Sequence, residues 1–185
     1  IDYSDGCYVG VGEEELISIV KKYSKLNLLL RSKEAVAPGY NDHKVMYAHY
    51  KLIEADYIMW LNPCHPLISH ETIKNAINYV KKNNYNSYTS VVECTDWIFS
   101  DDGLPITNTS ASMLSTAHSK KFYKVAHAFH VINKQFFLKD YQVWTLTKND
   151  PHLIPISESE NYDVNTEDEF FITEQAYKKF FNISK

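Results

Sequence analysis

A strand, a loop fixed by two prolines and a helix follow one another in residues 57–82, YIMWLNPCHPLISHETIKNAINYVKK. The first five residues are a continuous apolar run, which is typical of a strand buried on both faces of a parallel sheet. Ser69 can cap the helix that follows. The helix carries an apolar stripe at helical spacing, formed by Ile73, Ala76, Ile77 and Val80. Since α/β domains bind ligands where loops leave the carboxyl ends of parallel strands, this loop is the first place to look for a site.

Strands and helices alternate on both sides of this stretch. The pattern predicts strands over residues 7–11, 27–30, 57–61 and 88–93, and helices over residues 13–23, 42–52 and 69–82. This order predicts an α/β fold, a three-layer α/β/α domain with a largely parallel (mixed) sheet. No linker, repeat or low-complexity tract interrupts the chain, so residues 1–185 are interpreted as a single domain.

The second half of the chain does not continue the regular alternation of strands and helices. We expect strands over residues 129–132 and 153–156, after a polar stretch rich in Ser and Thr over residues 107–119. The last helix, over residues 166–180, opens with Thr166 and Glu169, whose spacing is that of a capping box.

Composition excludes several classes of protein. The chain has 185 residues, 44% of them hydrophobic and 23% charged, which is average for a globular domain and excludes a wholly disordered chain. A net charge of -4 argues against a nucleic-acid partner. There is no apolar run of about 18 residues, so neither a membrane span nor a membrane partner is expected. The cysteines are odd in number, widely spaced and without a Cys-x-x-Cys pair, which indicates reduced thiols in the cytoplasm.

Two motifs fail on inspection. Gly10-Val11-Gly12 lies between a strand and a helix, but Glu15 stands where a dinucleotide fingerprint needs glycine, and acidic residues crowd the helix N-terminus. A tight strand-to-helix turn is the better interpretation. His127 and His130 are three residues apart, so on a regular strand they face opposite sides and cannot share a metal.

Two stretches contain side chains that could bind a ligand or a metal ion. In the loop after the buried strand, two prolines fix the backbone and hold Asn62 toward the ligand-binding edge; the alternative is a stiff turn without a ligand. Asp163 and Asn165 alternate in an extended segment, so both point to one side and could ligate Mg2+ through oxygen. The alternative there is plain N-terminal capping of the last helix. Arg31, the chain's only arginine, ends an apolar strand and suits a planar anionic group, unless it pairs with Glu34.

Together these stretches resemble the acylneuraminate cytidylyltransferases, which include the CMP-sialic acid and CMP-3-deoxy-manno-octulosonate synthetases. Residues 61–68, LNPCHPLI, correspond to the family's Leu-Gln-Pro-Thr-Ser-Pro-Leu-Arg-like loop. Residues 163–170, DVNTEDEF, correspond to its Asp-Ile-Asp-Thr-x-x-Asp-Phe motif, with Asn165 replacing the second aspartate. Arg31-Ser32 matches an early Arg-Pro in part. The resemblance covers nearly the whole chain and implies a nucleotide-diphospho-sugar transferase-like fold.

The resemblance implies a nucleotidyltransferase that activates a nonulosonic or ulosonic acid with CTP, giving a CMP-sugar and pyrophosphate. It places Asp163 in catalysis and, with Asn165, at Mg2+, and it places Arg31 at the nucleotide. Asn62 is expected to contact the sugar. Lys120 and Lys121 could substitute on its carboxylate for arginines that the chain lacks.

Two further expectations concern the whole protein. Members carry a glycine-containing loop for the triphosphate near the N-terminus, and nothing similar precedes Ile1, so activity is expected if the full protein supplies such a loop. Members also dimerise through an inserted segment, which predicts a homodimer built on residues 103–144, a stretch rich in aromatic residues. The alternatives are internal packing of these rings, a transferase for another nucleotide or sugar, and a non-catalytic or truncated relative that acts as a binding or dimerisation module.

Overall fold

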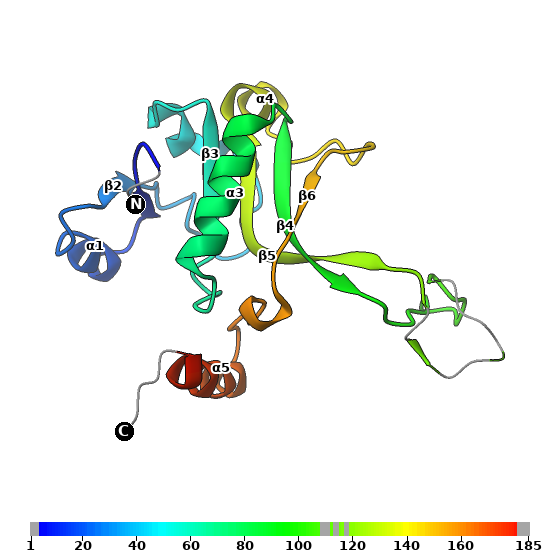
Figure 1. The fold of residues 1–185 in the computed structure, drawn as a ribbon. Helices are drawn as coiled ribbons and strands as arrows, with labels where there is room; N and C mark the ends of the chain where they lie inside the picture. Colours follow the sequence, from blue (N-terminus) through cyan, green and yellow to red (C-terminus); the bar gives the residue numbers. More distant parts are fainter. Residues whose placement is uncertain (1–3, 108–111, 113–114, 117–118, 181–185) are drawn as a thin grey trace. The chain divides into compact units, whose positions relative to one another are not determined.

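The computed structural model describes residues 4–107, 112, 115–116 and 119–180 (Figure 1). Its strands are β1 (Tyr8–Val11), β2 (Asn27–Leu30), β3 (Tyr57–Leu61), β4 (Ser87–Cys94), β5 (Phe122–Asn133) and β6 (His152–Pro155). Its α-helices are α1 (Glu14–Val20), α2 (His43–Met46), α3 (His70–Lys82), α4 (Lys134–Asp140) and α5 (Glu167–Phe180). Two short 3-10 helices, η1 (Ala48–Leu52) and η3 (Glu158–Glu160), complete the described elements.

Side-chain caps confirm the helix starts predicted at Asp42 and Ser69. The helix expected over residues 42–52 is divided into the four-residue α2 and the 3-10 helix η1. Asp42 accepts a hydrogen bond from the backbone N–H of Lys44 at 2.8 Å and begins α2. The Ser69 hydroxyl accepts one from Thr72 N at 3.1 Å and precedes α3. Such caps satisfy amides that the first helical turn leaves without partners. Because a few residue types do this next to the helix start, caps can be predicted from sequence.

The strands form two sheets, and the α/β fold with mixed pairing is confirmed. Strands β1 and β2 pair in parallel, and the second sheet has the order β3-β5-β4-β6. Strand β5 runs antiparallel to β3, because Asn62 N donates to Ala128 O at one end of the pair while Lys134 N donates to Asp56 O at the other. The alternation from β1 to β4 follows the predicted order. The pairing of β5 between β3 and β4 is long-range and was not predicted.

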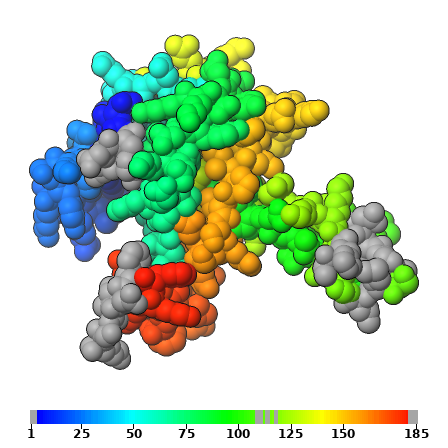
Figure 2. Space-filling model, in the orientation of Figure 1, coloured from blue at the N-terminus to red at the C-terminus, as the bar shows by residue number. Residues whose placement is uncertain are grey.

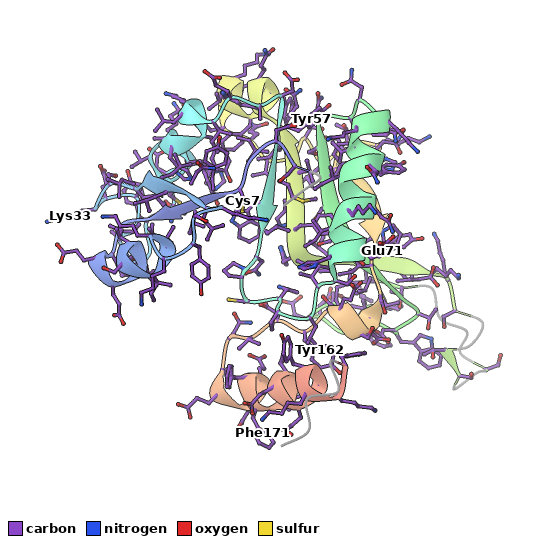
Figure 3. The ribbon with its side chains drawn as sticks, turned by 60° about the vertical axis from the view of Figure 1, so that its left-hand side comes forward. Cys7, Lys33, Tyr57, Glu71, Tyr162 and Phe171 are labelled. Carbon is purple, nitrogen blue, oxygen red and sulfur yellow. The ribbon has the colours of Figure 1, made fainter. Side chains whose placement is uncertain are left out.

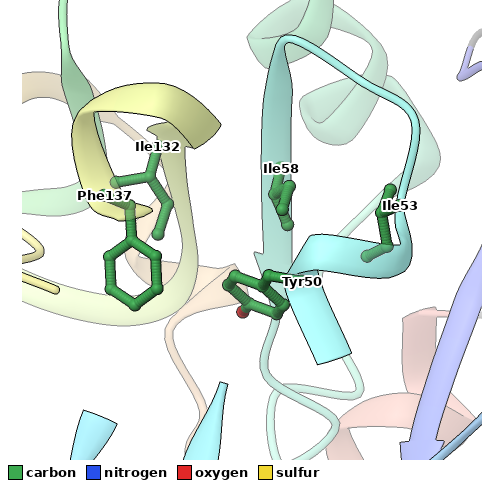
Figure 4. Packing of buried hydrophobic residues seen from close by; sticks show 5 residues of the cluster. All are labelled: Tyr50, Ile53, Ile58, Ile132 and Phe137. Atoms are coloured by element: carbon green, nitrogen blue, oxygen red, sulfur yellow. The ribbon is translucent and has the colours of Figure 1, made fainter. Parts of the chain in front are cut away.

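The chain divides into two compact units, and the single-domain interpretation stays a prediction. The first unit contains residues 1–60, 73–88 and 131–152. Its core joins η1, β3, β5 and α4 in one cluster of buried side chains, seen from close by in Figure 4: Tyr50, Ile53, Ile58, Ile132 and Phe137. Burying Phe137, which is 1% exposed, stabilises the unit by about 2 kcal/mol.

The second unit contains residues 61–72, 89–130 and 153–185. Strands β4 and β5 continue into it, and the described part of the segment between them is drawn in green shades in Figure 2. On this segment the Trp97 indole N–H donates to the Ser119 hydroxyl at 2.7 Å, and Phe99 forms an antiparallel bridge with Pro105. Part of the predicted dimerisation segment, within residues 108–118, lies outside the described residues.

The aromatic residues of segment 103–144 divide between core and surface. Phe129, at 0% exposed, and Phe137 are buried. The internal-packing alternative expects these rings under the last helix, but the phenylalanines of that helix, Phe170, Phe171 and Phe180, are exposed. Tyr123, Leu104 and Ile106 are exposed. Helix α4, which Asn133 caps through Phe136 N, was not predicted. Among the described residues, no helix is both long and apolar enough to cross a membrane.

Candidate functional site

The two stretches predicted to bind ligands, the Asn62 loop and the Asp163 segment, meet in the second unit. Val164 N donates to Cys64 O at 2.9 Å, so the segment before α5 lies along the loop that follows β3. Asn62 holds this loop in shape, because its side-chain oxygen accepts a hydrogen bond from Cys64 N at 3.0 Å. This local bond is the stiff turn of the alternative interpretation, and it leaves the side-chain amide N–H groups of Asn62 as donors for a ligand.

A buried histidine lies against the acidic residue of this pair of stretches. His65 is 1% exposed, and its Nδ1 lies 3.6 Å from Asp163 Oδ1. Burial lowers the pKa of His65, while the Asp163 carboxylate and the Ala126 carbonyl oppose the shift. In the described part of the chain His65 lies against Asp163 without a hydrogen bond to it, and the Asp163 side chain stays 41% exposed.

Among the described residues, Asp163 offers a free carboxylate oxygen to a cation but does not form a complete set of protein ligands. In the described part of the chain, its buried Oδ1 has no hydrogen-bond partner, which is unusual for a carboxylate oxygen. The described residues contain no group of three or more His, Cys, Asp or Glu side chains arranged for a metal. This donor set fits Mg2+, which keeps several waters and takes its other ligands from phosphate oxygens, and it does not fit a closed structural metal site.

The capping box beyond Asp163 is confirmed. Glu169 Oε2 accepts hydrogen bonds from Asn165 N at 2.8 Å and Thr166 N at 2.9 Å, while Glu169 N donates to Thr166 Oγ1 at 3.2 Å. Capping therefore uses the Asn165 backbone and leaves the Asp163 side chain out. The capping interpretation is confirmed, and Mg2+ binding by Asp163 and Asn165 stays a prediction. Figure 3 shows Tyr162, which leads into this segment, on the opposite side of α5 from Phe171.

The expected separation of His127 and His130 on β5 is wrong. His127 Nδ1 lies 3.2 Å from His130 Nε2, and the ring centroids are 5.3 Å apart. The reason is the backbone at His127, where φ is +58° and the alternation of a regular strand is broken. His130 Nδ1 lies 2.8 Å from the Thr89 hydroxyl oxygen on β4. Sequence reasoning missed this group, since nothing local signals a left-handed histidine inside a strand.

Arg31 lies in the first unit, directly after β2. Its Nη2 donates to Ala35 O at 2.6 Å and to Met46 O at 3.4 Å. Glu34 accepts a hydrogen bond from the Tyr40 hydroxyl at 3.0 Å, so the expected alternative of an Arg31–Glu34 pair is not what the structure has. Arg31 therefore ties two backbone segments together, and a role at a nucleotide stays a prediction.

The two lysines predicted for the sugar lie at the start of β5 in the second unit. Lys121 forms an ion pair with Glu93 at 2.8 Å, which raises the pKa of Lys121. The Lys120 ammonium lies 5.9 Å from the centre of the Phe122 ring. Both contacts are on the surface, where such pairs contribute little to stability. Within the described ranges, no hydrogen bond or ion pair joins either lysine to Asp163 or Asn62.

Comparisons with known proteins give the fold. No protein-family model matches the chain, and no curated protein sequence matches it. Among solved structures, it is similar to 4-diphosphocytidyl-2C-methyl-D-erythritol synthase from Anaerococcus prevotii, with a TM-score of 0.64 and 14% identity over 94% of this chain and 79% of that one. It is also similar to 2-C-methyl-D-erythritol 4-phosphate cytidylyltransferase from Francisella tularensis, with a TM-score of 0.58 and 10% identity over 93% and 80%.

The chain shares their fold. At these identities the likeness concerns the arrangement of strands and helices alone. It agrees with the nucleotide-diphospho-sugar transferase-like fold that the sequence motifs predict.

Proposed function

We propose that the chain is a cytidylyltransferase which transfers CMP from CTP to a nonulosonic or ulosonic acid and releases pyrophosphate. The observation that carries the proposal is the junction of the Asn62 loop with the Asp163 segment, through Val164 N to Cys64 O and His65 to Asp163. These are the two stretches on which the family resemblance rests. Two solved structures with this fold are named as cytidyl-transferring enzymes, which supports the reaction class.

The residues have separate roles in this proposal. Asp163, with Asn165, would hold Mg2+, whose charge offsets the negative charge of the triphosphate. The Asn62 amide would donate to a sugar hydroxyl or carboxylate, and Lys120 or Lys121 would act on that carboxylate as a point charge. Arg31 would contact the nucleotide. Transfer to phosphate needs positioning and charge neutralisation more than covalent chemistry by the protein, which suits a site without a nucleophile.

The working protein in this proposal is a cytoplasmic homodimer. The three cysteines Cys7, Cys64 and Cys94 are free thiols, which suits a reducing compartment. The exposed apolar side chains of Leu104 and Ile106 on the predicted dimerisation segment support an interface with a second copy of the chain.

A second candidate acceptor comes from the solved structures. Both are named for methylerythritol or its 4-phosphate, a sugar-alcohol phosphate and not a sugar acid. The phosphate and the carboxylate are both anions that a lysine can bind, so the acceptor must be tested directly. A non-catalytic relative remains the alternative from another functional class.

The test is pyrophosphate release by the full-length protein with CTP and Mg2+. The acceptors are sialic acid, 3-deoxy-manno-octulosonate and 2-C-methyl-D-erythritol 4-phosphate. We expect release with a sugar acid, and a loss of about 100-fold or more in Asp163→Ala, the scale for removing a group that acts on transition-state charge. Asp168→Ala is the matched control, because this exposed carboxylate lies five residues away on α5.

Titration calorimetry separates binding from turnover. Mg2+ should bind wild type more tightly when CTP is present, and Asp163→Ala should lose this coupling while Asp168→Ala keeps it. Equal behaviour of the two variants would show that Asp163 does not hold the ion. Nucleotide binding without turnover on any acceptor would support the non-catalytic alternative.

A further inference from the structure

His127 has a backbone conformation that its position does not explain. Its φ of +58° is left-handed, which is unfavourable for any residue other than glycine. The other described non-glycine residues with positive φ are Tyr141, Leu146 and Asn149, all outside the strands, whereas His127 lies inside β5. A strained histidine in a strand, with an exposed side chain, points to a use for its imidazole.

Hydrogen bonds orient this imidazole through a second histidine. The buried Thr89 hydroxyl donates to Ser90 O at 3.5 Å, which leaves its oxygen to accept the Nδ1–H of His130 at 2.8 Å. His130 Nε2 is then an acceptor and takes the Nδ1–H of His127 at 3.2 Å. In this arrangement His127 Nε2 carries a lone pair, as in a general base oriented by a partner group.

Within the hydrogen-bonded group of Thr89, His130 and His127, the proton acceptor is His127 and not His130. Burial and the neighbouring His127 lower the pKa of His130 to about 4, so His130 stays neutral near pH 7 and can accept a hydrogen bond from a protonated His127. Among the described residues, His65 interacts electrostatically with His127, and Asp163 lies beside His65.

His127 and His130 lie beside the residues proposed to hold the substrates. Asn62 N donates to Ala128 O at 3.0 Å, so the residue that follows His127 pairs directly with the proposed sugar-binding residue. His65 lies 3.6 Å from Asp163 and interacts with His127. All of these residues belong to the second unit.

We propose that His127 is the general base of the transfer reaction, with His130 and Thr89 as positioning residues; this rests on the proposed function. A hydroxyl oxygen of the acceptor bonds to the α-phosphorus of CTP, and the bond from that phosphorus to the bridging oxygen of the β-phosphate breaks. Pyrophosphate leaves with the electron pair, and the hydroxyl proton moves to His127 Nε2. General-base assistance typically contributes about 10²–10⁴-fold to the rate.

The test uses two variants that suit the left-handed backbone, His127→Gly and His127→Asn, in the full-length protein. Glycine adopts φ near +58° without strain, so His127→Gly should keep or raise the midpoint of thermal unfolding while kcat falls about 100-fold or more. Leu146→Gly is the matched control, because Leu146 has φ +56° and is 77% exposed outside this group. It should change neither kcat nor CTP affinity.

Three readouts distinguish a base from a merely structural residue. Wild-type kcat should fall as the pH is lowered and His127 takes up a proton, and this acidic limb should be absent in His127→Asn. Added imidazole should restore part of the activity of His127→Gly. CTP affinity by calorimetry should change less than about threefold, since the base acts on the acceptor hydroxyl.

The outcomes separate this inference from the proposed function. An active wild type whose kcat is unchanged in His127→Gly would overturn the role of His127 alone. A wild type that binds CTP and turns over none of the acceptors would overturn the proposed function, and the base with it. A lost kcat that imidazole does not restore, with an unchanged pH profile, would also reject His127 as the base.

Discussion

At the scale of single residues, the contacts of Arg31 assign it a structural task that the sequence did not predict. Its guanidinium joins the carbonyls of Ala35 and Met46, which lie eleven residues apart. The Arg31 side chain also passes close to Gly10, where an added Cβ would lie 3.3 Å from Arg31 Cδ and 3.2 Å from His49 Nε2. Gly10 is therefore explained by close packing. The tight strand-to-helix turn that we expected is the two-residue connection between β1 and α1, formed by Gly12 and Glu13.

Arg31→Lys tests both roles of this side chain. A lysine places one ammonium where the guanidinium fork reaches two carbonyls, so we expect the free energy of unfolding in urea to fall by about 1 kcal/mol. If Arg31 also binds the nucleotide, CTP affinity should fall in the same variant and not in Lys33→Ala. A loss of stability with unchanged CTP affinity would leave Arg31 with the structural role alone.

At the scale of secondary-structure elements, α3 depends on an acidic residue distant in sequence. Glu160, in η3, accepts hydrogen bonds from Ser69 N at 2.9 Å and from the Thr72 hydroxyl at 2.8 Å. The carboxylate thus occupies the N-terminus of α3, where the helix dipole favours negative charge. Burial alone would raise the pKa of Glu160, but the hydrogen bonds from Ser69 and Thr72 outweigh it and lower the pKa.

Glu160→Ala should lower the free energy of unfolding by about 1–2 kcal/mol at pH 7, because it removes a cap and a charge at the helix end. Since the folded-state pKa is depressed, this stabilisation is present above the unfolded-state pKa of 4.5 and is lost as the pH falls through the folded value. Urea unfolding of wild type and variant at pH 7 and pH 3 measures the difference. Glu158→Ala, an exposed acid of the same turn, should behave like wild type; an equal loss there would contradict the specific cap.

At the scale of the whole molecule, the predicted homodimer cannot be tested by a substitution at a buried aromatic residue. Phe137 belongs to the core cluster with Tyr50, so Phe137→Glu would bury a charge and unfold the first unit, whatever the state of assembly. Leu104 and Ile106 are each 63% exposed on the predicted segment and can be changed without such a cost.

Light scattering at micromolar concentration should give a mass of two chains for the wild-type protein. Ile106→Glu should reduce the mass to that of one chain and leave the thermal midpoint of folding near that of the isolated wild-type protomer, because a charge at an apolar interface is costly and at a free surface is not. Leu146→Glu, at an exposed leucine outside the segment, is the control. A wild-type mass near 21.5 kDa would rule out the dimer for this chain.

Much of the secondary structure could be predicted from sequence because the interactions that determine it are local. A cap such as Ser69 or Thr166 acts three residues away, and β3 is a continuous apolar run, so these elements and their starts could be predicted within a few residues. The start of β5 and the whole of α4 could not. The two chemistry-bearing stretches were also identified, since prolines around Asn62 and the alternation of Asp163 with Asn165 are sequence patterns.

Tertiary structure alone decided which side chains meet. The antiparallel place of β5, the burial of Phe137, the carbonyl partners of Arg31 and the contact of His127 with His130 all join residues through the fold or through a backbone angle that the fold imposes. Residue types and spacing do not encode these, because a left-handed φ at a histidine is disfavoured locally and persists only where surrounding contacts hold it. The proposed binding loop was therefore predictable from the chain, and the proposed base beside it was not.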